Sequence, residues 1–248
     1  MTGVKPFVVI ATPRSGSNWL CTLLDSHPQI LCHHELFNPD GVHLAWSLRG
    51  TDFKLGGLEL QRNHPLALLE RAWANTLGFS HVGFKLNVGQ SEAVFDTVLD
   101  APEVRKILVY RRNRVRAFVS ECIAEASGQW ESYPESEPPR AKQAVRVDPD
   151  ELRAHARRNA DYLHAIRQRL QGTGQRALEV AYEDLEEAQT RAQMLDFLGV
   201  DPGVSLRGGT RRMNPEPLSR LVSNLDELAA AVKGDDLAAD LAAEASHD

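Results

Sequence analysis

The sequence has few cysteines, no long apolar run and no surplus of positive charge. Its 248 residues include three cysteines, an odd number that excludes a fully paired disulfide framework and favours free thiols in a reducing cytoplasm. No apolar run approaches the ~20 residues that span a bilayer, and no charged-then-apolar leader opens the chain, so no integral membrane segment is predicted. A formal net charge of −6 argues against a general nucleic-acid binder and leaves room for a local anion site.

The sequence does contain an alternation of short apolar runs with helix-like stretches. Strand-like runs occupy 7–11, 82–86, 106–110 and 177–181, and helical patterns occupy 17–25, 66–77, 92–99, 115–126, 150–170 and 191–198. Strands separated by helices must return through crossovers, which favours a mostly parallel β-sheet flanked by helices. We therefore predict a single α/β domain over residues 1–248, with ligands at the carboxyl ends of the strands.

Two segments depart from this alternation. Residues 128–149 are rich in proline, serine and glutamate without apolar periodicity, which predicts a loop or lid. The tail after residue 225 is rich in alanine and acidic residues and is predicted to be a surface helix that frays. The sequence does not predict the oligomeric state, and an oligomer is compatible with it.

The first anion signal is the segment 12–18, Thr-Pro-Arg-Ser-Gly-Ser-Asn, which joins the first predicted strand to a helix. Unpaired N–H groups and the dipole make a helix N-terminus attractive to phosphate or sulfate. The segment lacks the G-x-x-x-x-G-K-[ST] spacing, so the Lys and the Mg²⁺-holding hydroxyl of a nucleoside triphosphate loop are missing. The cluster Cys32-His33-His34-Glu35 lacks the spacing of metal ligands, and no metal is predicted.

A second anion signal follows the strand at 106–110. Arg112 is placed at the end of that strand, and Ser120 lies about two helical turns further along the chain. Two anion-binding strand ends in one sheet suggest a ligand with two anionic groups, such as a nucleotide with phosphates at both ends of its ribose.

These two motifs, in this order, resemble the sulfotransferases that use 3′-phosphoadenosine 5′-phosphosulfate (PAPS). The resemblance implies a P-loop-like sulfotransferase fold with PAPS as sulfuryl donor. Further along, 182–185 is similar to the family's Tyr-Glu-Asp-Leu, and 211–228 is similar to its loop over the nucleotide. The first loop would hold the 5′-phosphosulfate, Arg112 and Ser120 the 3′-phosphate. The donor-binding residues that this implies are Arg14, Ser15, Gly16, Ser17, Asn18, Trp19, Arg112, Ser120, Arg211 and Arg212.

Within the family, the first loop and His34-Glu35-Leu36-Phe37 look most like the bacterial trehalose sulfotransferase group, whose catalytic base is a Glu. This implies Glu35 as general base, with Arg14, His34 and Lys85 as further catalytic candidates. Cytosolic members use a His base, so a share of His33 or His34 in that role stays open. No match to the group's disaccharide contacts is present, so the acceptor is predicted only as a small carbohydrate, lipid or natural product.

Two alternatives stay open at this point. A P-loop-type phosphotransferase is disfavoured by the absent loop Lys and by the lack of an evident pair of carboxylates for Mg²⁺. A non-catalytic nucleotide-binding protein would carry the same two anion loops. Turnover and the role of Glu35 discriminate between these readings.

Overall fold

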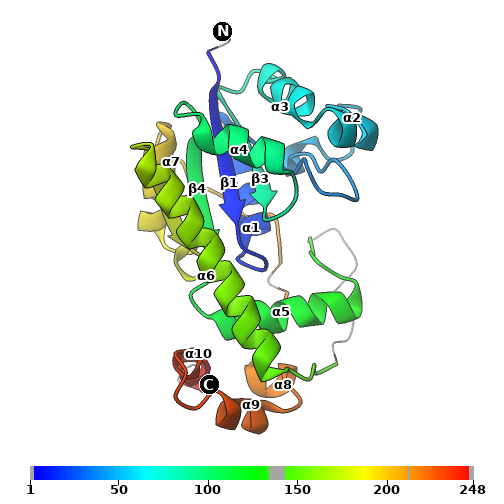
Figure 1. Cartoon of the computed structure of the whole chain (residues 1–248). Coiled ribbons are helices and arrows are strands. Elements are labelled where there is room, and N and C mark those ends of the chain that lie inside the picture. The colour runs from blue at the N-terminus through cyan, green and yellow to red at the C-terminus, as the bar shows by residue number, and fades with distance from the viewer. Residues whose placement is uncertain (1–2, 134–142, 212, 246–248) are drawn as a thin grey trace.

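The structure is a computed structural model that describes residues 3–133, 143–211 and 213–245. Its strands and helices alternate along most of the chain (Figure 1). The strands are β1 (Lys5–Ala11), β2 (Ile30–Glu35), β3 (His81–Asn87), β4 (Arg105–Tyr110) and β5 (Ala177–Ala181). The α-helices are α1 (Ser17–Asp25), α2 (Leu58–Asn63), α3 (Pro65–Ala74), α4 (Glu92–Asp100), α5 (Arg114–Ser127), α6 (Pro149–Gly172), α7 (Ala188–Leu198), α8 (Leu218–Leu221), α9 (Leu225–Ala231) and α10 (Leu237–Ala245). Short 3₁₀ turns occupy Trp46–Leu48 and Tyr182–Asp184.

The strands form one parallel sheet in the order β2-β3-β1-β4-β5. The predicted α/β class with a parallel sheet is therefore confirmed. The edge strand β2 was not predicted as a strand, because its sequence Ile-Leu-Cys-His-His-Glu ends in polar residues that break the apolar run. Glu35 is the last residue of this strand, so the structure gives the candidate base a rigid support.

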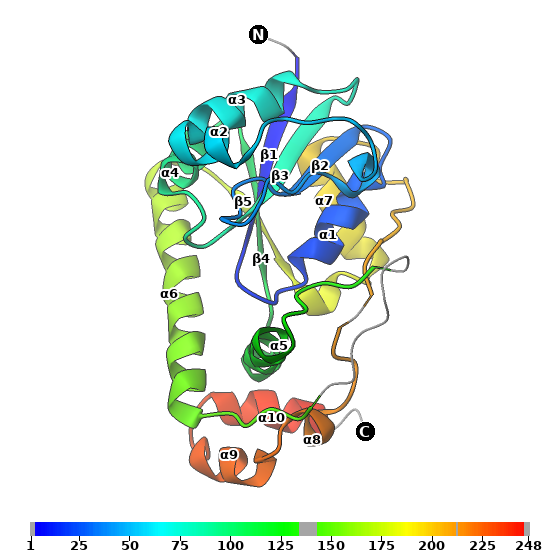
Figure 2. The same cartoon turned by 90° about the vertical axis from the view of Figure 1, so that its right-hand side faces the viewer.

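Helices cover both faces of the sheet (Figure 2). Along β1, Phe7 and Val9 pack in a cluster with residues of α1 and α7, whereas Val8 and Ile10 pack in a second cluster with residues of α3, α4 and α6. This division follows from the alternation of side chains along a strand. Gly83 on β3 is required by the packing, since a Cβ there would lie 2.5 Å from the Phe7 ring.

The last three helices form a further apolar cluster with α5 and the first half of α6. Leu228, Val232 and Leu237 are buried in it. Asp240 on α10 accepts hydrogen bonds from the Arg114 backbone N–H at 2.9 Å and from the Arg114 Nε at 2.8 Å. The predicted surface helix after residue 225 corresponds to two short helices, α9 and α10, which pack against α5 and α6, because long-range packing stabilises helices that are short and alanine-rich.

Only the two ends of the predicted lid at 128–149 lie within the described residues, which omit 134–142. Beyond that gap, Val145 donates a backbone hydrogen bond of 2.9 Å to Leu221. Asp148 caps α6, accepting from the N–H groups of Asp150 and Glu151 at 2.8 and 3.1 Å. The lid prediction itself stays a prediction.

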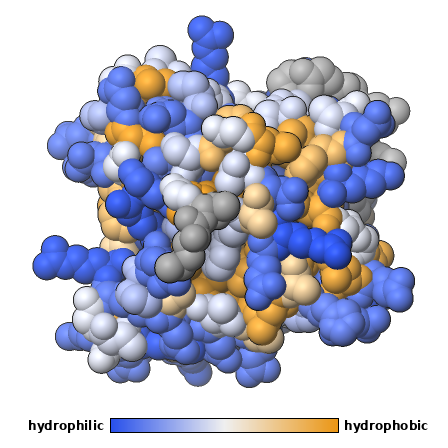
Figure 3. Space-filling model, turned by 90° about the horizontal axis from the view of Figure 1, so that it is seen from above, coloured by the Kyte–Doolittle hydropathy of each residue, from blue (hydrophilic) through white to orange (hydrophobic). Residues whose placement is uncertain are grey.

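The amino ends and the carboxyl ends of the parallel strands lie at opposite ends of the sheet (Figure 1). Viewed from the side of the strand amino ends, the surface is a mosaic in which hydrophilic and hydrophobic side chains alternate (Figure 3). Within the described ranges, none of the helices is long and apolar enough to cross a bilayer. The carboxyl ends of the strands lie at the opposite end, where the first predicted anion loop follows β1.

Candidate active site

The loops that follow the strands surround a cleft of about 510 Å³, a size typical of sites for small ligands. Every strand contributes to its wall, either with its last residues or with the residues that follow. The residues that line it come from 12–19 after β1, 35–40 around the end of β2, 85–90 at the end of β3, Arg111 and 120–121 after β4, Tyr182 after β5, and the segments 130–132 and 210–214.

The first loop has the backbone geometry of a tight anion cradle. Arg14 and Gly16 both have positive φ angles, 55° and 76°, and the Ser15 hydroxyl closes the turn with a hydrogen bond of 2.7 Å to the Thr12 carbonyl. A Cβ on Gly16 would lie 2.2 Å from the Tyr182 ring, so only glycine fits. Gly16 forms the N-cap of α1 without a side-chain hydrogen bond, which leaves the first N–H groups of the helix for a ligand.

Arg14 connects the first loop to the second predicted anion site. Its Nε donates to the Ser120 hydroxyl at 3.0 Å, and its Nη1 donates to the Trp130 carbonyl at 2.5 Å. Ser120 Oγ also accepts from Asn214 at 2.9 Å. Burial lowers the Arg14 pKa, and the carboxylates Glu121 and Glu131 oppose that shift. Arg14 and Ser120, one from each predicted anion loop, therefore lie together in the cleft.

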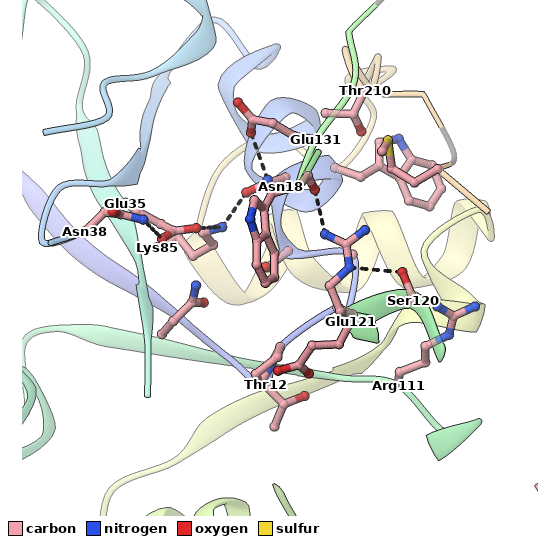
Figure 4. Close-up of a pocket in the computed structure, with 18 of the residues that line it drawn as sticks. Thr12, Asn18, Glu35, Asn38, Lys85, Arg111, Ser120, Glu121, Glu131 and Thr210 are labelled. Carbon is pink, nitrogen blue, oxygen red and sulfur yellow. Dashed lines mark hydrogen bonds and ion pairs between the residues drawn. The ribbon is translucent and has the colours of Figure 1, made fainter. Parts of the chain in front are cut away.

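Glu35 forms the start of a chain of polar contacts across the cleft (Figure 4). Its Oε1 lies 2.5 Å from the Lys85 Nζ, and its Oε2 accepts hydrogen bonds from Asn38 at 2.7 Å and from Gln90 at 2.5 Å. Lys85 also donates to the side-chain carbonyl of Asn18, in the first loop. The predicted residues Glu35, Lys85 and Asn18 are thus in one hydrogen-bonded group.

The charge on Glu35 is strongly favoured in this arrangement. Burial raises the pKa of the carboxyl group, but the Lys85 ammonium and the hydrogen bonds from Asn38 and Gln90 outweigh burial and lower the pKa to about 2. The carboxylate is ionised at neutral pH and keeps 17% of its side-chain surface exposed toward the cleft.

The two histidines beside Glu35 lie outside the cleft. His33 is fully buried, its Nδ1 accepts from the Ala45 N–H at 3.1 Å, and burial lowers its pKa to about 4. His34 is buried against the Tyr133 ring in an edge-on contact of 6.4 Å. Burial, together with Lys85 and Arg49, lowers its pKa well below the usual range. Neither ring lines the cleft, so the expectation that His34 takes part in catalysis finds no geometric support.

At the end of β4 the structure also differs from the prediction made from the sequence. Arg112 points out of the cleft, is 52% exposed, and forms a bidentate pair with Asp184, with Nη1 to Oδ2 at 2.7 Å. Arg111 lines the cleft instead, with 11% of its side chain exposed and its guanidinium 4.6 Å from the centre of the Tyr182 ring. Of the two arginines after β4, the one that lines the cleft with Ser120 is therefore Arg111, not the predicted Arg112.

The remaining predicted residues are only partly at the cleft. Trp19 lines it while packing edge-on against Tyr182 at 6.2 Å, so it serves both the core and the site. Arg211 donates its backbone N–H to Ser132 at 2.9 Å and does not line the cleft, whereas its neighbours Thr210 and Met213 do. Arg212 lies outside the described residues.

Within the predicted loop 128–149, the sequence did not identify Glu131, which lines the cleft. Glu131 accepts from Asn18 at 3.0 Å, from Tyr133 at 2.8 Å and from Arg49 at 3.3 Å. The Tyr133 ring stacks on Trp46 at 4.0 Å. No local motif marks Glu131, because its role depends on contacts with residues about 80 and 110 positions away in the chain. Within the described ranges, no group of three or more His, Cys, Asp or Glu side chains is arranged to hold a metal.

Comparisons with known proteins cover nearly the whole chain. No family model matches. Nodulation protein H of Rhizobium meliloti (strain 1021) is 29% identical over 242 residues, with 90% of each chain covered, and that of Rhizobium tropici is 28% identical over 237 residues, with 90% and 88% covered. A solved structure titled as a sulfotransferase, from Alicyclobacillus acidocaldarius, matches with a TM-score of 0.47 and 16% identity over 96% of this chain and 94% of that chain. The nodulation relatives extend the similarity well beyond the two anion loops.

Proposed function

We propose that this protein is a sulfotransferase that moves a sulfuryl group from PAPS to a hydroxyl group of a small-molecule acceptor, with Glu35 as general base. One observation carries the proposal: the ionised and largely buried carboxylate of Glu35 shares a cleft with the uncapped N-terminus of α1, and Lys85 links the two by contacting both Glu35 and Asn18. A carboxylate that can accept a proton and a cradle that can hold an anion are the two elements that sulfuryl transfer needs.

The residues of the cleft fit the chemistry of the donor. The free N–H groups at the start of α1 and the Arg14 guanidinium suit a phosphosulfate, since both donate hydrogen bonds to anionic oxygens. Ser120 and Arg111 offer a hydroxyl and a second guanidinium for the 3′-phosphate. The absence of a Cβ at Gly16 lets the loop lie against Tyr182 and keeps the N–H groups open to the ligand.

In the proposed reaction, the bond from sulfur to the acceptor oxygen forms while the bond from sulfur to the 5′-phosphate oxygen breaks. Glu35 takes the proton of the acceptor hydroxyl. The electron pair of the broken bond stays on the phosphate, where Arg14 and the N–H groups of the first loop stabilise the charge. The carboxylate needs no prior deprotonation, because its pKa of about 2 keeps it ionised.

The acceptor is proposed to enter over the rim formed by Asn38, Pro39 and Val88, which continues from Glu35. A carbohydrate, lipid or natural product with a free hydroxyl group fits this open end of the cleft.

A reducing cytoplasm is proposed as the compartment, because Cys21 and Cys32 are buried as free thiols.

The test is transfer of ³⁵S-labelled sulfate from PAPS to a panel of sugars, lipids and phenols. For an acceptor that is labelled, Glu35→Gln should lower kcat by ~10²–10⁴-fold, since the amide cannot take the proton. Asp40→Asn, which removes another carboxylate of the cleft wall, is the matched control and should retain most of the turnover. Full activity of Glu35→Gln would refute the base assignment.

The same panel separates the two alternatives. Transfer of a γ-phosphoryl group from ATP, with no transfer from PAPS, would favour a phosphotransferase. Binding of 3′,5′-adenosine bisphosphate without transfer to any acceptor would favour a non-catalytic nucleotide-binding protein.

A further inference from the structure

The Lys85 side chain is shared between the candidate base and the first anion loop. Its ammonium lies 2.5 Å from Glu35 Oε1 and donates a second hydrogen bond to the side-chain carbonyl of Asn18 (Figure 4). With 3% of its side chain exposed, Lys85 must satisfy its charge through protein or ligand groups rather than through bulk water. Any anion that enters beside Asn18 therefore competes with Glu35 for the same ammonium.

We propose that Lys85 holds Glu35 in an ion pair until the donor binds, and that the sulfuryl oxygens of the donor then take over the ammonium and release the carboxylate to act as base. The inference rests on the proposed function and adds an order of events to it: the base becomes effective only when the group to be transferred is in place.

The charge state of Glu35 supports this order. The ion pair with Lys85 and the hydrogen bonds from Asn38 and Gln90 overcome burial and lower the carboxyl pKa to about 2. A carboxylate with such a low pKa is a weak base, because proton transfer is most efficient when the pKa of the base is closer to the working pH. Moving Lys85 to the sulfuryl group removes the main stabilising charge and returns the pKa toward its ordinary value of 4.5 or above.

Other titratable and charged side chains lie near the Lys85–Glu35 ion pair. His34 on β2, together with His43 and Arg49 in the segment that follows, interacts electrostatically in this region, and Cys32 lies near Lys85. Burial, Lys85 and Arg49 lower the pKa of His34 well below its usual range, so its ring is neutral at pH 7 and adds no positive charge beside Lys85. All four groups are retained when Glu35 alone is changed, so a variant of Glu35 isolates the exchange.

The first test is donor affinity at pH 7, measured by calorimetry with PAPS in the absence of acceptor. Glu35→Gln should bind PAPS more tightly than the unmodified protein, because the donor no longer competes with a carboxylate for Lys85. If donor binding raises the Glu35 pKa from about 2 to 4.5, the unmodified protein loses up to about 300-fold in PAPS affinity by linkage, and Glu35→Gln should recover that factor. Asp40→Asn removes a negative charge from the same cleft without contact to Lys85, so its affinity should change by less than about 5-fold.

The second test measures protons taken up when PAPS binds at pH 4.5, from the calorimetric heats in two buffers with different ionisation enthalpies. The unmodified protein should take up about half a proton more per bound PAPS than Glu35→Gln, because a Glu35 pKa that rises from about 2 to 4.5 is half-titrated at this pH. Proton changes on the nucleotide itself are common to both proteins and cancel in the difference.

The outcomes separate this inference from the function on which it rests. PAPS binding with equal affinity and equal proton uptake in the two proteins would show that Lys85 stays on Glu35, and would overturn the exchange while leaving the sulfotransferase intact. Failure of both proteins to bind PAPS would overturn the proposed function and the exchange together. Lys85→Met, if it folds, should bind PAPS without any uptake that depends on Glu35.

Discussion

The two adjacent arginines after β4 provide the sharpest test of how the cleft would bind the proposed nucleotide. The family resemblance assigns the 3′-phosphate to Arg112, whereas the structure turns Arg112 toward Asp184 and Arg111 into the cleft. We expect Arg111→Ala to weaken 3′,5′-adenosine bisphosphate but to leave adenosine 5′-monophosphate almost unchanged. Arg112→Ala is the matched control, because it removes the same side chain one residue away.

The magnitude follows from the surroundings of each guanidinium. Arg111 is 11% exposed, and a hydrogen bond from such a group to a phosphate is worth about 1.5–3 kcal/mol, or roughly 10- to 150-fold in Kd. Arg112 is 52% exposed and already paired with Asp184, and exposed pairs contribute about 0–1 kcal/mol. Its loss should therefore change Kd for either nucleotide by no more than about 5-fold.

Titration calorimetry with both nucleotides measures these differences directly. The ratio of the two Kd values, 5′-monophosphate over bisphosphate, should collapse in Arg111→Ala and persist in Arg112→Ala. The reverse pattern would refute the assignment and show that Arg112 leaves Asp184 to bind the 3′-phosphate, as the family resemblance implies. Equal losses for both nucleotides in Arg111→Ala would show that this side chain supports Tyr182 rather than a phosphate.

Two further predictions concern stability. The Glu35 pKa of about 2, against an ordinary value of 4.5, stabilises the folded protein above pH 4.5, and this contribution is lost as the pH falls toward 2. At pH 3 the free energy of unfolding, measured with urea, should be about 2 kcal/mol lower because of Glu35. This loss should be absent in Glu35→Gln. Parallel pH profiles of the two proteins would contradict the low pKa. Gly16→Ala should lower both the melting temperature and the donor affinity, because its Cβ would lie 2.2 Å from the Tyr182 ring. Gly174→Ala is the control, since Gly174 has a similar φ of 68° and no atom lies within 4 Å of the position of its Cβ. It should cost only about 1–2 kcal/mol of backbone strain and leave donor binding intact.

Sequence patterns predicted four of the five strands and missed the edge strand β2. The central strands are apolar runs buried on both faces, so their composition alone indicates strands. β2 ends in two histidines and a glutamate, and its pairing with β3 decides its structure rather than its own propensity. The last helices were missed as packed elements for the same reason, because their stability comes from α5, α6 and the contact between Arg114 and Asp240.

In the candidate site, too, the features set by local sequence were predicted and those set by long-range contacts were not. The first loop was recognisable because its chemistry is local: a glycine with positive φ, small hydroxyl residues and a helix start within seven residues. The choice between Arg111 and Arg112 was not local. Successive side chains at a strand end point to opposite sides, and an apolar run buried on both faces carries no signal of which side holds the cleft. Glu131 and Asn214 reach the cleft from segments that only the folded chain brings together.

Charge balance explains why a carboxylate suits this cleft better than the neighbouring histidines. A base that takes the acceptor proton changes its charge by one unit, and that change must be tolerated beside the Lys85 ammonium. Protonation of His34 would create a buried cation next to Lys85, and both burial and Lys85 already oppose it by lowering the His34 pKa. Protonation of Glu35 instead removes a negative charge and leaves no buried cation, while in the proposed exchange the Lys85 ammonium already interacts with the anionic sulfuryl group. The same lysine that makes an imidazolium costly therefore makes the carboxylate a base whose strength depends on the donor.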